Sequence, residues 1–442
     1  MDKQIKSYTL HNYREIPRMS SLPAEMLRDI EVVGRVLPFK TNNYVVEELI
    51  DWNNVEEDPI FTLNFPRRGM LREKHYARIE RLMAEGADKA TIDRAVQDIR
   101  MQLNPNPAGQ EHNVPMLGEI RLKGIQHKYP ETVLFFPSQG QTCHAYCTFC
   151  FRWPQFSGMS ELRFAMKEAD LLVKYLRIHK EVTDVLFTGG DPMVMSAAML
   201  DSYIRPLLTE PGLKHIHSIR IGTKSLAYWP YRYLTDADSG RIIELFTDIV
   251  AAGKNLSIQA HFNHPVELST KAVKTAIERI KSTGAQIRTQ SPLLRHINDK
   301  PELWSEMWRR QVDLGCIPYY MFIARDTGAK HYFELPLDKC WGIFRRAYRK
   351  VSGLCRTVRG PSMSDHPGKI QVLGVAEAKG EKVFVLRFLQ GRNPKWVDVP
   401  FFAAYDPKAT WFNQLKPAFG EEKFFFEQDR EALMETKPFL FE

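Results

Sequence analysis

Three cysteines, Cys143, Cys147 and Cys150, lie close together in the stretch CHAYCTFC. Soft thiolate ligands favour an iron–sulfur centre, copper(I) or zinc, and three of them on one loop can bind three irons of a cubane cluster. A structural zinc site normally has a fourth ligand, for which His144 is awkwardly placed because it adjoins Cys143. An electron-transfer cluster would also have a fourth cysteine. The spacing therefore indicates a cluster with one iron open to a substrate or cofactor.

A second stretch that could do chemistry is TGGDP, over residues 188–192. Its two adjacent glycines allow the backbone to approach a ligand closely. Taken alone, the sequence GGDP within this stretch is common in turns. Here they follow an apolar run and come after the cysteine loop, which indicates a ligand-binding turn at the end of a strand.

The elements that position these residues follow a regular alternation from about residue 130. It predicts an α/β fold with a parallel sheet, in the form of a partial TIM-type (β/α)6 barrel, with a doubly wound sheet as the alternative. In either architecture, ligands bind at the C-terminal ends of the strands. The expected strands are 132–137, 184–189, 218–222, 256–262, 286–294 and 317–323, and the expected helices are 164–180, 196–209, 239–253, 269–284 and 302–315.

The chain divides into three expected parts. Residues 1–127 form a mainly helical N-terminal extension, which includes a helix-forming stretch over 71–103. Residues 128–330 form the barrel. Residues 331–442 form a C-terminal α+β extension with a helix over 338–353, a hairpin made by 370–377 and 382–391, and an aromatic tail. We expect this tail to pack over the barrel or against a partner subunit.

The composition excludes several classes of protein. The 442 residues are 44% hydrophobic and 26% charged, which is usual for a globular protein and argues against a disordered, collagen-like or disulfide-rich chain. The net charge of +8 suits anionic ligands and does not by itself indicate nucleic acid. No apolar run is long enough to span a membrane, and the N-terminus lacks an apolar signal region. We therefore expect a cytoplasmic protein in which Cys316, Cys340 and Cys355 are reduced and buried.

The spacing C-x3-C-x2-C, with Phe149 before the last cysteine, resembles the radical S-adenosylmethionine superfamily. This resemblance implies a [4Fe-4S] cluster bound by the three cysteines, S-adenosylmethionine as cofactor, and a one-electron reductant of the flavodoxin or ferredoxin type. It also implies that Gly189, Gly190 and Asp191 of the TGGDP stretch meet the methionine amino group of S-adenosylmethionine.

The resemblance narrows to the lysine 2,3-aminomutase family, which pairs S-adenosylmethionine with pyridoxal phosphate. The matching stretches run in the family's order and cover about 128–370. They are KYPETVLFF, CTFCFRW, DVLFTGGDPM, IRIGTK, AHFNHPVELS, RTQSPLLRHIND and PYYMFIARDTG.

The family's pyridoxal phosphate needs a Schiff-base lysine and groups that bind its phosphate. Lys369, in DHPGK, matches the family's lysine, although three glycines of the family's loop are absent here. A lysine on a glycine loop is otherwise usually solvated. Lys128 and Gln290 match residues at the phosphate, and Arg220 and Arg288, at strand ends, could also serve.

The resemblance also implies residues for the substrate and for S-adenosylmethionine. Arg152 matches an arginine that binds the substrate carboxylate, a role for which its forked cation is suited. Asp326 and Asp365 match two aspartates that bind the ε-ammonium of lysine. Asp326 could instead cap a turn, and Asp365 could form an Asx-turn. His261 of the HFNHP motif, Gln290 and Phe149 are expected in the S-adenosylmethionine pocket.

We therefore predict a radical aminomutase, an isomerase that converts L-lysine to β-lysine. A 5′-deoxyadenosyl radical would remove a hydrogen from C3, and the amino group would move from C2 to C3. The alternatives are action on arginine, ornithine or glutamate, a different radical reaction on a pyridoxal phosphate adduct, and a non-enzymatic cluster- or metal-binding module. We expect no zinc site, no nucleic-acid or membrane partner, and a homo-oligomer.

Overall fold

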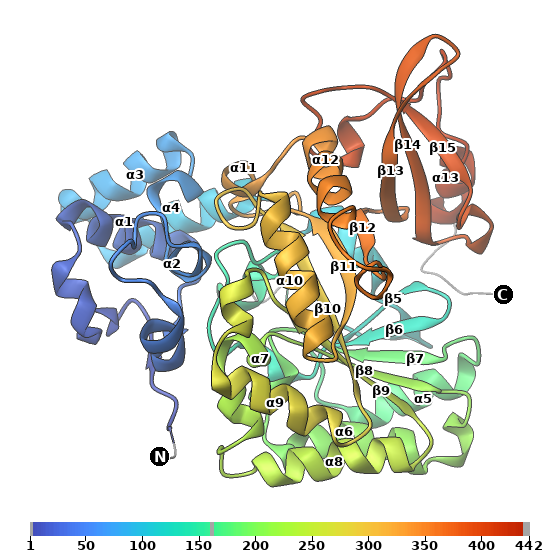
Figure 1. Cartoon of the computed structure of the whole chain (residues 1–442), viewed down its shortest axis with the longest axis horizontal. Helices are drawn as coiled ribbons and strands as arrows, with labels where there is room; N and C mark the ends of the chain where they lie inside the picture. The colour runs from blue at the N-terminus through green and yellow to red at the C-terminus, as the bar shows by residue number, and fades with distance from the viewer. Residues whose placement is uncertain (1–2, 160–162, 436–442) are drawn as a thin grey trace.

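The computed structural model describes residues 3–159 and 163–435, and Figure 1 shows the chain. Its centre is one mixed sheet of eleven strands in the order β15-β14-β13-β12-β11-β10-β9-β8-β7-β6-β5. Neighbours from β6 to β12 are parallel, which confirms an α/β fold. The parallel strands are β6 (Thr132–Phe135), β7 (Asp184–Phe187), β8 (Ser218–Thr223), β9 (Asn255–His261), β10 (Gln286–Leu293), β11 (Ile317–Ile323) and β12 (Arg359–Ser364).

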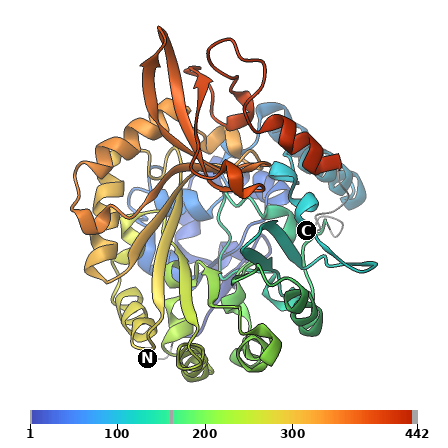
Figure 2. The ribbon, with the colours of Figure 1, turned by 90° about the vertical axis from the view of Figure 1, so that its right-hand side faces the viewer.

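The helices that join these strands lie outside the sheet (Figure 2). They bury one apolar stripe each, as in α9, where Val273, Ala276, Ile277 and Ile280 are buried. The helices are α5 (Ala169–Ile178), α6 (Ala197–Thr209), α7 (Ser225–Tyr228), α8 (Ser239–Ala251), α9 (Lys271–Lys281), α10 (Pro301–Asp313), α11 (Lys330–Phe333) and α12 (Leu337–Tyr348). The predicted alternation of strands and helices is confirmed.

Strand β8 shows how the sequence orients the sheet. Ile219 and Ile221 are fully buried, whereas Arg220 and Gly222 between them line a cavity. Because side chains alternate along a strand, the apolar residues face the helices and the others face inward. The interior of the curved sheet is therefore where polar groups gather.

The N-terminal part forms a lobe at one end of the molecule (Figure 1). The stretch 71–103 is two helices, because Gly86 adopts a positive φ of 67° and Asp88 begins a new helix by accepting a hydrogen bond from the Thr91 amide. The elements of the lobe and of the segment that follows it are β1 (Ser7–Tyr8), α1 (Ala24–Val36), β2 (Thr41–Asn42), α2 (Pro59–Asn64), α3 (Glu73–Ala84), α4 (Lys89–Gln102), β3 (Met116–Leu117), β4 (Ile120–Arg121) and β5 (Ile125–Tyr129).

The C-terminal part continues the same sheet. The predicted hairpin is confirmed as β13 (Gly368–Ala378) and β14 (Glu381–Gly391), which pair antiparallel and are followed by β15 (Pro400–Ala404) and α13 (Glu427–Glu435). The aromatic tail packs on the hairpin, where the ring of Phe426 lies 4.9 Å from that of Phe388. Strands β5, β12 and β15 of this sheet were not predicted.

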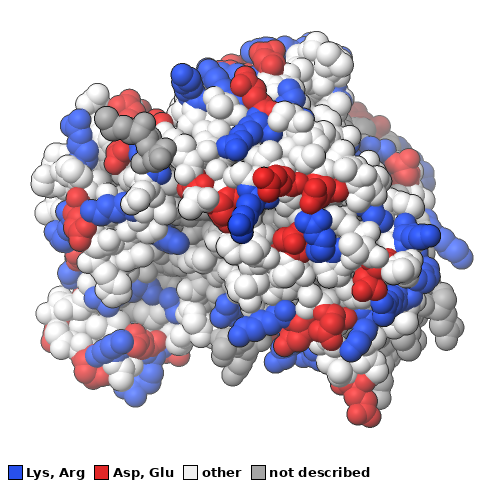
Figure 3. All heavy atoms as spheres, turned by 90° about the horizontal axis from the view of Figure 1, so that it is seen from below, with Lys and Arg blue, Asp and Glu red and all other residues white. Residues whose placement is uncertain are grey.

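Two further observations concern the surface. No helix in the described part of the chain is long and apolar enough to cross a membrane. On the face drawn in Figure 3, acidic and basic side chains are interspersed.

Candidate active site

A cavity of about 330 Å3 lies at the inner side of the sheet. Its walls come mainly from β5 and β6, from the loops after β6, β7 and β11, from inward residues of β8 to β11, and from the start of β13. Residues 108–113 of the N-terminal part also contribute. Most of the predicted site residues line it: Lys128, Cys143, Cys147, Phe149, Cys150, Arg152, Gly189, Gly190, Asp191, Arg220, His261, Gln290 and Lys369. Asp326, Asp365 and Arg288 are not among its lining residues.

The cysteine loop lies between the sheet and the N-terminal lobe. All three cysteines are free thiols that line the cavity, and burial raises the pKa of Cys147 to about 11 and that of Cys150 to about 12. Lys40 Nζ donates to the Cys143 carbonyl at 2.7 Å, and the Thr148 amide donates to the Leu63 carbonyl at 2.9 Å. Residues far earlier in the chain therefore hold this loop.

The donor set fits a polynuclear cluster better than a single ion. Within residues 3–159 and 163–435, no group of three His, Cys, Asp or Glu side chains is placed to hold one metal ion. In a cubane each cysteine binds a different iron, so the three sulfurs do not converge on one point. Three free thiols on one loop that face one cavity fit that arrangement.

The glycine pair packs directly against the cysteine loop. Gly189 adopts a φ of 140°, and a β-carbon on it would lie 2.9 Å from the side-chain amide carbon of Gln141. A β-carbon on Gly190 would lie 2.7 Å from the carbonyl carbon of Thr142. Only glycine allows so close an approach at these two positions.

The carboxylate of Asp191 already has hydrogen-bond partners within the protein. Its carboxylate accepts hydrogen bonds from Thr223 Oγ1 at 2.7 Å, from the Lys224 amide at 2.9 Å and from the Met193 amide at 3.0 Å. Its own amide donates to the Thr142 carbonyl at 2.7 Å. Burial raises the pKa of Asp191. Asp191 therefore ties the turn after β7 to β8 through its carboxylate and to the cysteine loop through its amide.

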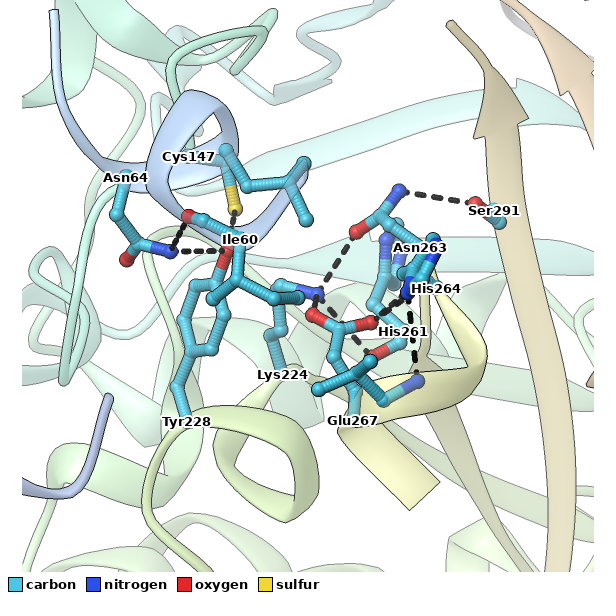
Figure 4. A network of polar contacts seen from close by, with 12 residues as sticks. Ile60, Asn64, Cys147, Lys224, Tyr228, His261, Asn263, His264, Glu267 and Ser291 are labelled. Carbon is cyan, nitrogen blue, oxygen red and sulfur yellow. Dashed lines mark hydrogen bonds and ion pairs between the residues drawn. The ribbon is translucent and has the colours of Figure 1, made fainter. Parts of the chain in front are cut away.

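A buried polar network adjoins Cys147 (Figure 4). Lys224 Nζ pairs with Glu267 Oε1 at 2.6 Å and donates to Asn263 Oδ1 at 2.7 Å. Tyr228 Oη lies 3.6 Å from Cys147 Sγ. Sequence reasoning assigned no role to Lys224, Tyr228 or Glu267, although Lys224 closes IRIGTK and Glu267 lies within AHFNHPVELS.

His261, the last residue of β9, contacts Gln290 within the neighbouring strand β10. Their Nε2 atoms lie 2.6 Å apart. Burial lowers the pKa of His261 to about 3, so the ring is neutral and its Nε2 can accept the amide proton of Gln290. Phe149, on the cysteine loop, also lines the cavity and packs edge-on against Phe333.

Lys369 lies at the start of β13, opposite Ser364 of β12. Its Nζ donates to Gln390 Oε1 at 3.0 Å and lies 4.1 Å from the centre of the Tyr320 ring. Burial lowers its pKa to about 7. A lysine with that pKa carries a substantial fraction of neutral, nucleophilic amine near neutral pH. Lys369 is therefore not a solvated loop lysine, because its amine contacts Gln390 and Tyr320.

The predicted phosphate-binding residues differ in whether they line the cavity and in the contacts that they already make within the protein. Lys128 Nζ lines the cavity, donates to the Asp365 carbonyl, and has a pKa lowered by burial. Arg220 also lines the cavity but pairs with Asp184 at 2.6 Å. Arg288 donates to Gln286 Oε1 at 3.0 Å.

Two arginines face the cavity beside Phe151. The guanidinium carbon of Arg152 lies 5.1 Å from the centre of that ring, and that of Arg325 lies 4.7 Å from it. In the described part of the chain, Arg152 Nη1 and Arg325 Nε are buried and have no hydrogen-bond partner. Sequence reasoning identified Arg152 and missed Arg325, which precedes the predicted Asp326.

The two predicted substrate aspartates, Asp326 and Asp365, are not among the residues that line the cavity. Asn104 Nδ2 donates to the Asp326 carbonyl at 2.8 Å and to its Oδ2 at 3.3 Å, while Oδ1 is buried without a partner among the described residues. Asp365 Oδ1 accepts from the His366 amide at 2.7 Å, and burial raises the pKa of Asp365. Asp365 therefore takes part in local loop structure, whereas Asp326 contacts a residue from the N-terminal part of the chain.

Comparisons with known proteins gave three informative relatives. A protein of Aquifex aeolicus named "Putative L-lysine 2,3-aminomutase" is 29% identical over 405 residues, which cover 92% of this chain and 95% of that protein. The L-lysine 2,3-aminomutase of Clostridium subterminale is 26% identical over 58% of each chain. The glutamate 2,3-aminomutase of Clostridioides difficile is 25% identical over 67% of this chain and 65% of its own.

Two other comparisons add little. No protein-family model matches the chain. Among solved structures, a radical SAM methyltransferase from Sphaerobacter thermophilus aligns with 66% of this chain and 94% of its own, at 14% identity and a TM-score of 0.34. A likeness at that score supports no argument about this protein.

Proposed function

Since the chain belongs to the lysine 2,3-aminomutase family of radical S-adenosylmethionine enzymes, we propose that it moves the amino group of a free α-amino acid from C2 to C3. The observation that carries this proposal is the shared cavity. The cysteine loop, the glycine pair and the buried amine of Lys369 all border it.

The residues present fit the three cofactors that this reaction uses. We assign Cys143, Cys147 and Cys150 to a [4Fe-4S] cluster. Together, the cluster and S-adenosylmethionine would supply the radical chemistry that removes hydrogen from an unactivated carbon. Pyridoxal phosphate would supply a carbonyl that carries the amino group. Gly189 and Gly190, with Phe149, His261 and Gln290, border the space assigned to S-adenosylmethionine.

The chain's own groups act by binding and by holding protons. Lys369 can offer a neutral amine to the carbonyl of pyridoxal phosphate, because burial lowers its pKa to about 7. Lys128 and Gln290 border the same space and are assigned to the phosphate. Nη1 of Arg152 is buried and has no partner among the residues that the structure describes. We assign this guanidinium to the substrate carboxylate, which it can bind through two parallel hydrogen bonds.

The cavity walls suit a reaction that must exclude water. Phe149, Phe151, Phe322 and Phe333 line the cavity together with Tyr320. Holding the reacting carbon in place within such walls lowers the entropic cost of the reaction and prevents side reactions.

The architecture proposed for this chemistry is a partial (β/α)6 barrel built from β6 to β11 and their helices, within residues 128–330. The helical N-terminal extension supports the cysteine loop through Lys40 and Leu63. The C-terminal extension brings Lys369 to the cavity. A small one-electron donor and a homo-oligomeric state remain predictions of this account.

L-Lysine is the substrate that the two aspartates predict. The names of several relatives support it, as does Oδ1 of Asp326, which has no hydrogen-bond partner among the described residues. Against it, neither Asp326 nor Asp365 is a lining residue, and Oδ1 of Asp365 already accepts a hydrogen bond from the His366 amide. The experiment must therefore determine which amino acid is the substrate.

The test is a product assay without oxygen. The protein is loaded with iron, sulfide and pyridoxal phosphate, reduced with dithionite, and given S-adenosylmethionine and single L-amino acids. We expect one β-amino acid, identified by mass spectrometry against standards, and none from a Lys369→Ala variant. If 5′-deoxyadenosine forms but no β-amino acid appears from any amino acid, a different radical reaction is the better account. Absence of both iron–sulfur absorbance and sulfide would favour a non-enzymatic metal-binding module.

A further inference from the structure

The cavity is lined by many more cationic than anionic side chains. Asp191 is its one lining carboxylate among the described residues, and that carboxylate is occupied by internal hydrogen bonds. Three of the cations have carboxylate partners outside the lining: Arg220 with Asp184, Lys224 with Glu267 and Lys330 with Glu334. Four have no carboxylate ion pair in the described part of the chain: Lys128, Arg152, Arg325 and Lys369.

The proposed function uses three of these four cations. Lys369 is assigned to pyridoxal phosphate, Lys128 to its phosphate and Arg152 to the substrate carboxylate. Arg325 has no assigned role. Its Nη2 donates to the Ser364 carbonyl at 2.7 Å, but its Nε is buried with no partner among the described residues. A buried donor without an acceptor is costly, so this group is suited to a ligand.

Arg325 and Asp326 are consecutive in the chain, but only Arg325 is a lining residue of the cavity. The carboxylate of Asp326 accepts a hydrogen bond from Asn104 of the N-terminal part. At this place the chain therefore presents a cation to the substrate. A substrate ammonium beside Arg325 would meet a like charge at close range, which is unfavourable in a desolvated site.

We propose that Arg325 binds a carboxylate on the substrate's side chain, so that the enzyme acts on an acidic α-amino acid held by Arg152 and Arg325 together. The two guanidinium groups border the same Phe151 ring, as two carboxylates of one short molecule require. This inference rests on the proposed aminomutase function and names its substrate class. A phosphate group is the other oxyanion that a guanidinium binds in this way, and pyridoxal phosphate would supply it.

The first arm of the test measures binding without turnover. Protein loaded with cluster and pyridoxal phosphate, with S-adenosylmethionine omitted, is titrated with L-glutamate, L-aspartate and L-lysine, and the absorbance of the pyridine ring is followed. Wild type should bind L-glutamate or L-aspartate more tightly than L-lysine. Arg325→Gln should weaken that binding roughly 10- to 100-fold, as expected for the loss of a charge-assisted hydrogen bond. Arg325→Lys should restore part of it.

The second arm measures turnover and the affinity for pyridoxal phosphate. Arg325→Gln should raise KM for the acidic amino acid while the affinity for pyridoxal phosphate stays at the wild-type value. The matched control is Arg309→Gln, because Arg309 is exposed on α10. It should leave both quantities unchanged.

Three results would overturn the inference. Conversion of L-lysine but of no acidic amino acid would overturn it and leave the aminomutase function standing. A fall in pyridoxal phosphate affinity in Arg325→Gln, with amino acid preference unchanged, would assign Arg325 to the phosphate. Failure to form any β-amino acid would count against the proposed function, and the binding arm would then decide the role of Arg325: equal binding of L-glutamate by wild type and Arg325→Gln would exclude it.

Discussion

The α-carbon of Gly190 faces the backbone of Thr142 so closely that a β-carbon there would lie 2.7 Å from the Thr142 carbonyl carbon. The neighbouring Asp191 amide donates to the same carbonyl. The turn after β7 and the cysteine loop after β6 therefore form one packed unit. A change in one should therefore displace the other, which couples the glycine pair to the loop that we assign to the cluster.

Replacing Gly190 by alanine should displace the cysteine loop. The new methyl group cannot be accommodated without backbone movement, which typically costs about 1–3 kcal/mol. We expect less iron and sulfide per chain after reconstitution, and lower activity. The control is Gly240→Ala, because a β-carbon there meets no atom within 4 Å. Equal iron content in both variants would contradict this reading of the loop.

Tyr228 should tune the cluster through Cys147. When Cys147 is a thiolate, only the tyrosine can donate in the 3.6 Å contact, and hydrogen bonds to cluster sulfurs raise the reduction potential. We therefore expect Tyr228→Phe to lower the potential in a spectroelectrochemical titration, with unchanged iron content.

The matched variant is Tyr233→Phe. Tyr233 is also buried, but its hydroxyl contacts Ser225 at 2.7 Å rather than a cysteine. Removing it should lower stability without moving the potential. A shift of the same size in both variants would assign the effect to general packing.

Incorporation of pyridoxal phosphate should depend on pH through Lys369. An amine reacts only when neutral, and burial lowers the pKa of this one from 10.5 to about 7. The rate of incorporation should rise as pH increases through about 7 and level off roughly one unit above it. Stopped-flow absorbance measures this rate. A rate that keeps rising towards pH 10 would show a lysine with an ordinary pKa, and Lys379→Ala, on the exposed turn between β13 and β14, should not alter the profile.

The buried ion pair of Lys224 and Glu267 should matter for stability. Glu267 is fully buried, and Lys224 is nearly so. Glu267→Gln leaves the ammonium buried without its counter-ion, which costs about 3–5 kcal/mol. The midpoint of urea unfolding should fall accordingly, whereas Glu278→Gln, at an exposed position of α9, should leave it unchanged. Similar midpoints for the two variants would refute the expectation.

Much of the parallel sheet could be predicted from the sequence because buried parallel strands are continuous apolar runs. The expected strand over 317–323 coincides with β11. Strand β12 was missed because its residues, Arg359–Ser364, include glycine, proline and two serines, and its pairing with β11 is a tertiary contact. The break between α3 and α4 was missed because helix-forming composition masked Gly86 and Asp88.

That the cysteine loop and the glycine pair border one cavity could be predicted, because their residue types and spacing are themselves the signal. The residues assigned to the substrate could not be predicted in the same way. The sequence pattern ARDTG does not reveal which of Arg325 and Asp326 faces the cavity, because that depends on a hydrogen bond from Asn104, far earlier in the chain. The buried position of Lys369, despite its shortened loop, depends on the pairing of β12 with β13.

The most direct test of the central claim follows one hydrogen atom. The loaded enzyme is given S-adenosylmethionine with L-glutamate, and separately with L-lysine, deuterated at C3. The account predicts deuterium in 5′-deoxyadenosine and a β-amino acid product from the accepted substrate, with nitrogen on C3 and deuterium on C2. Unlabelled 5′-deoxyadenosine, or a product that keeps its nitrogen on C2, would contradict the account.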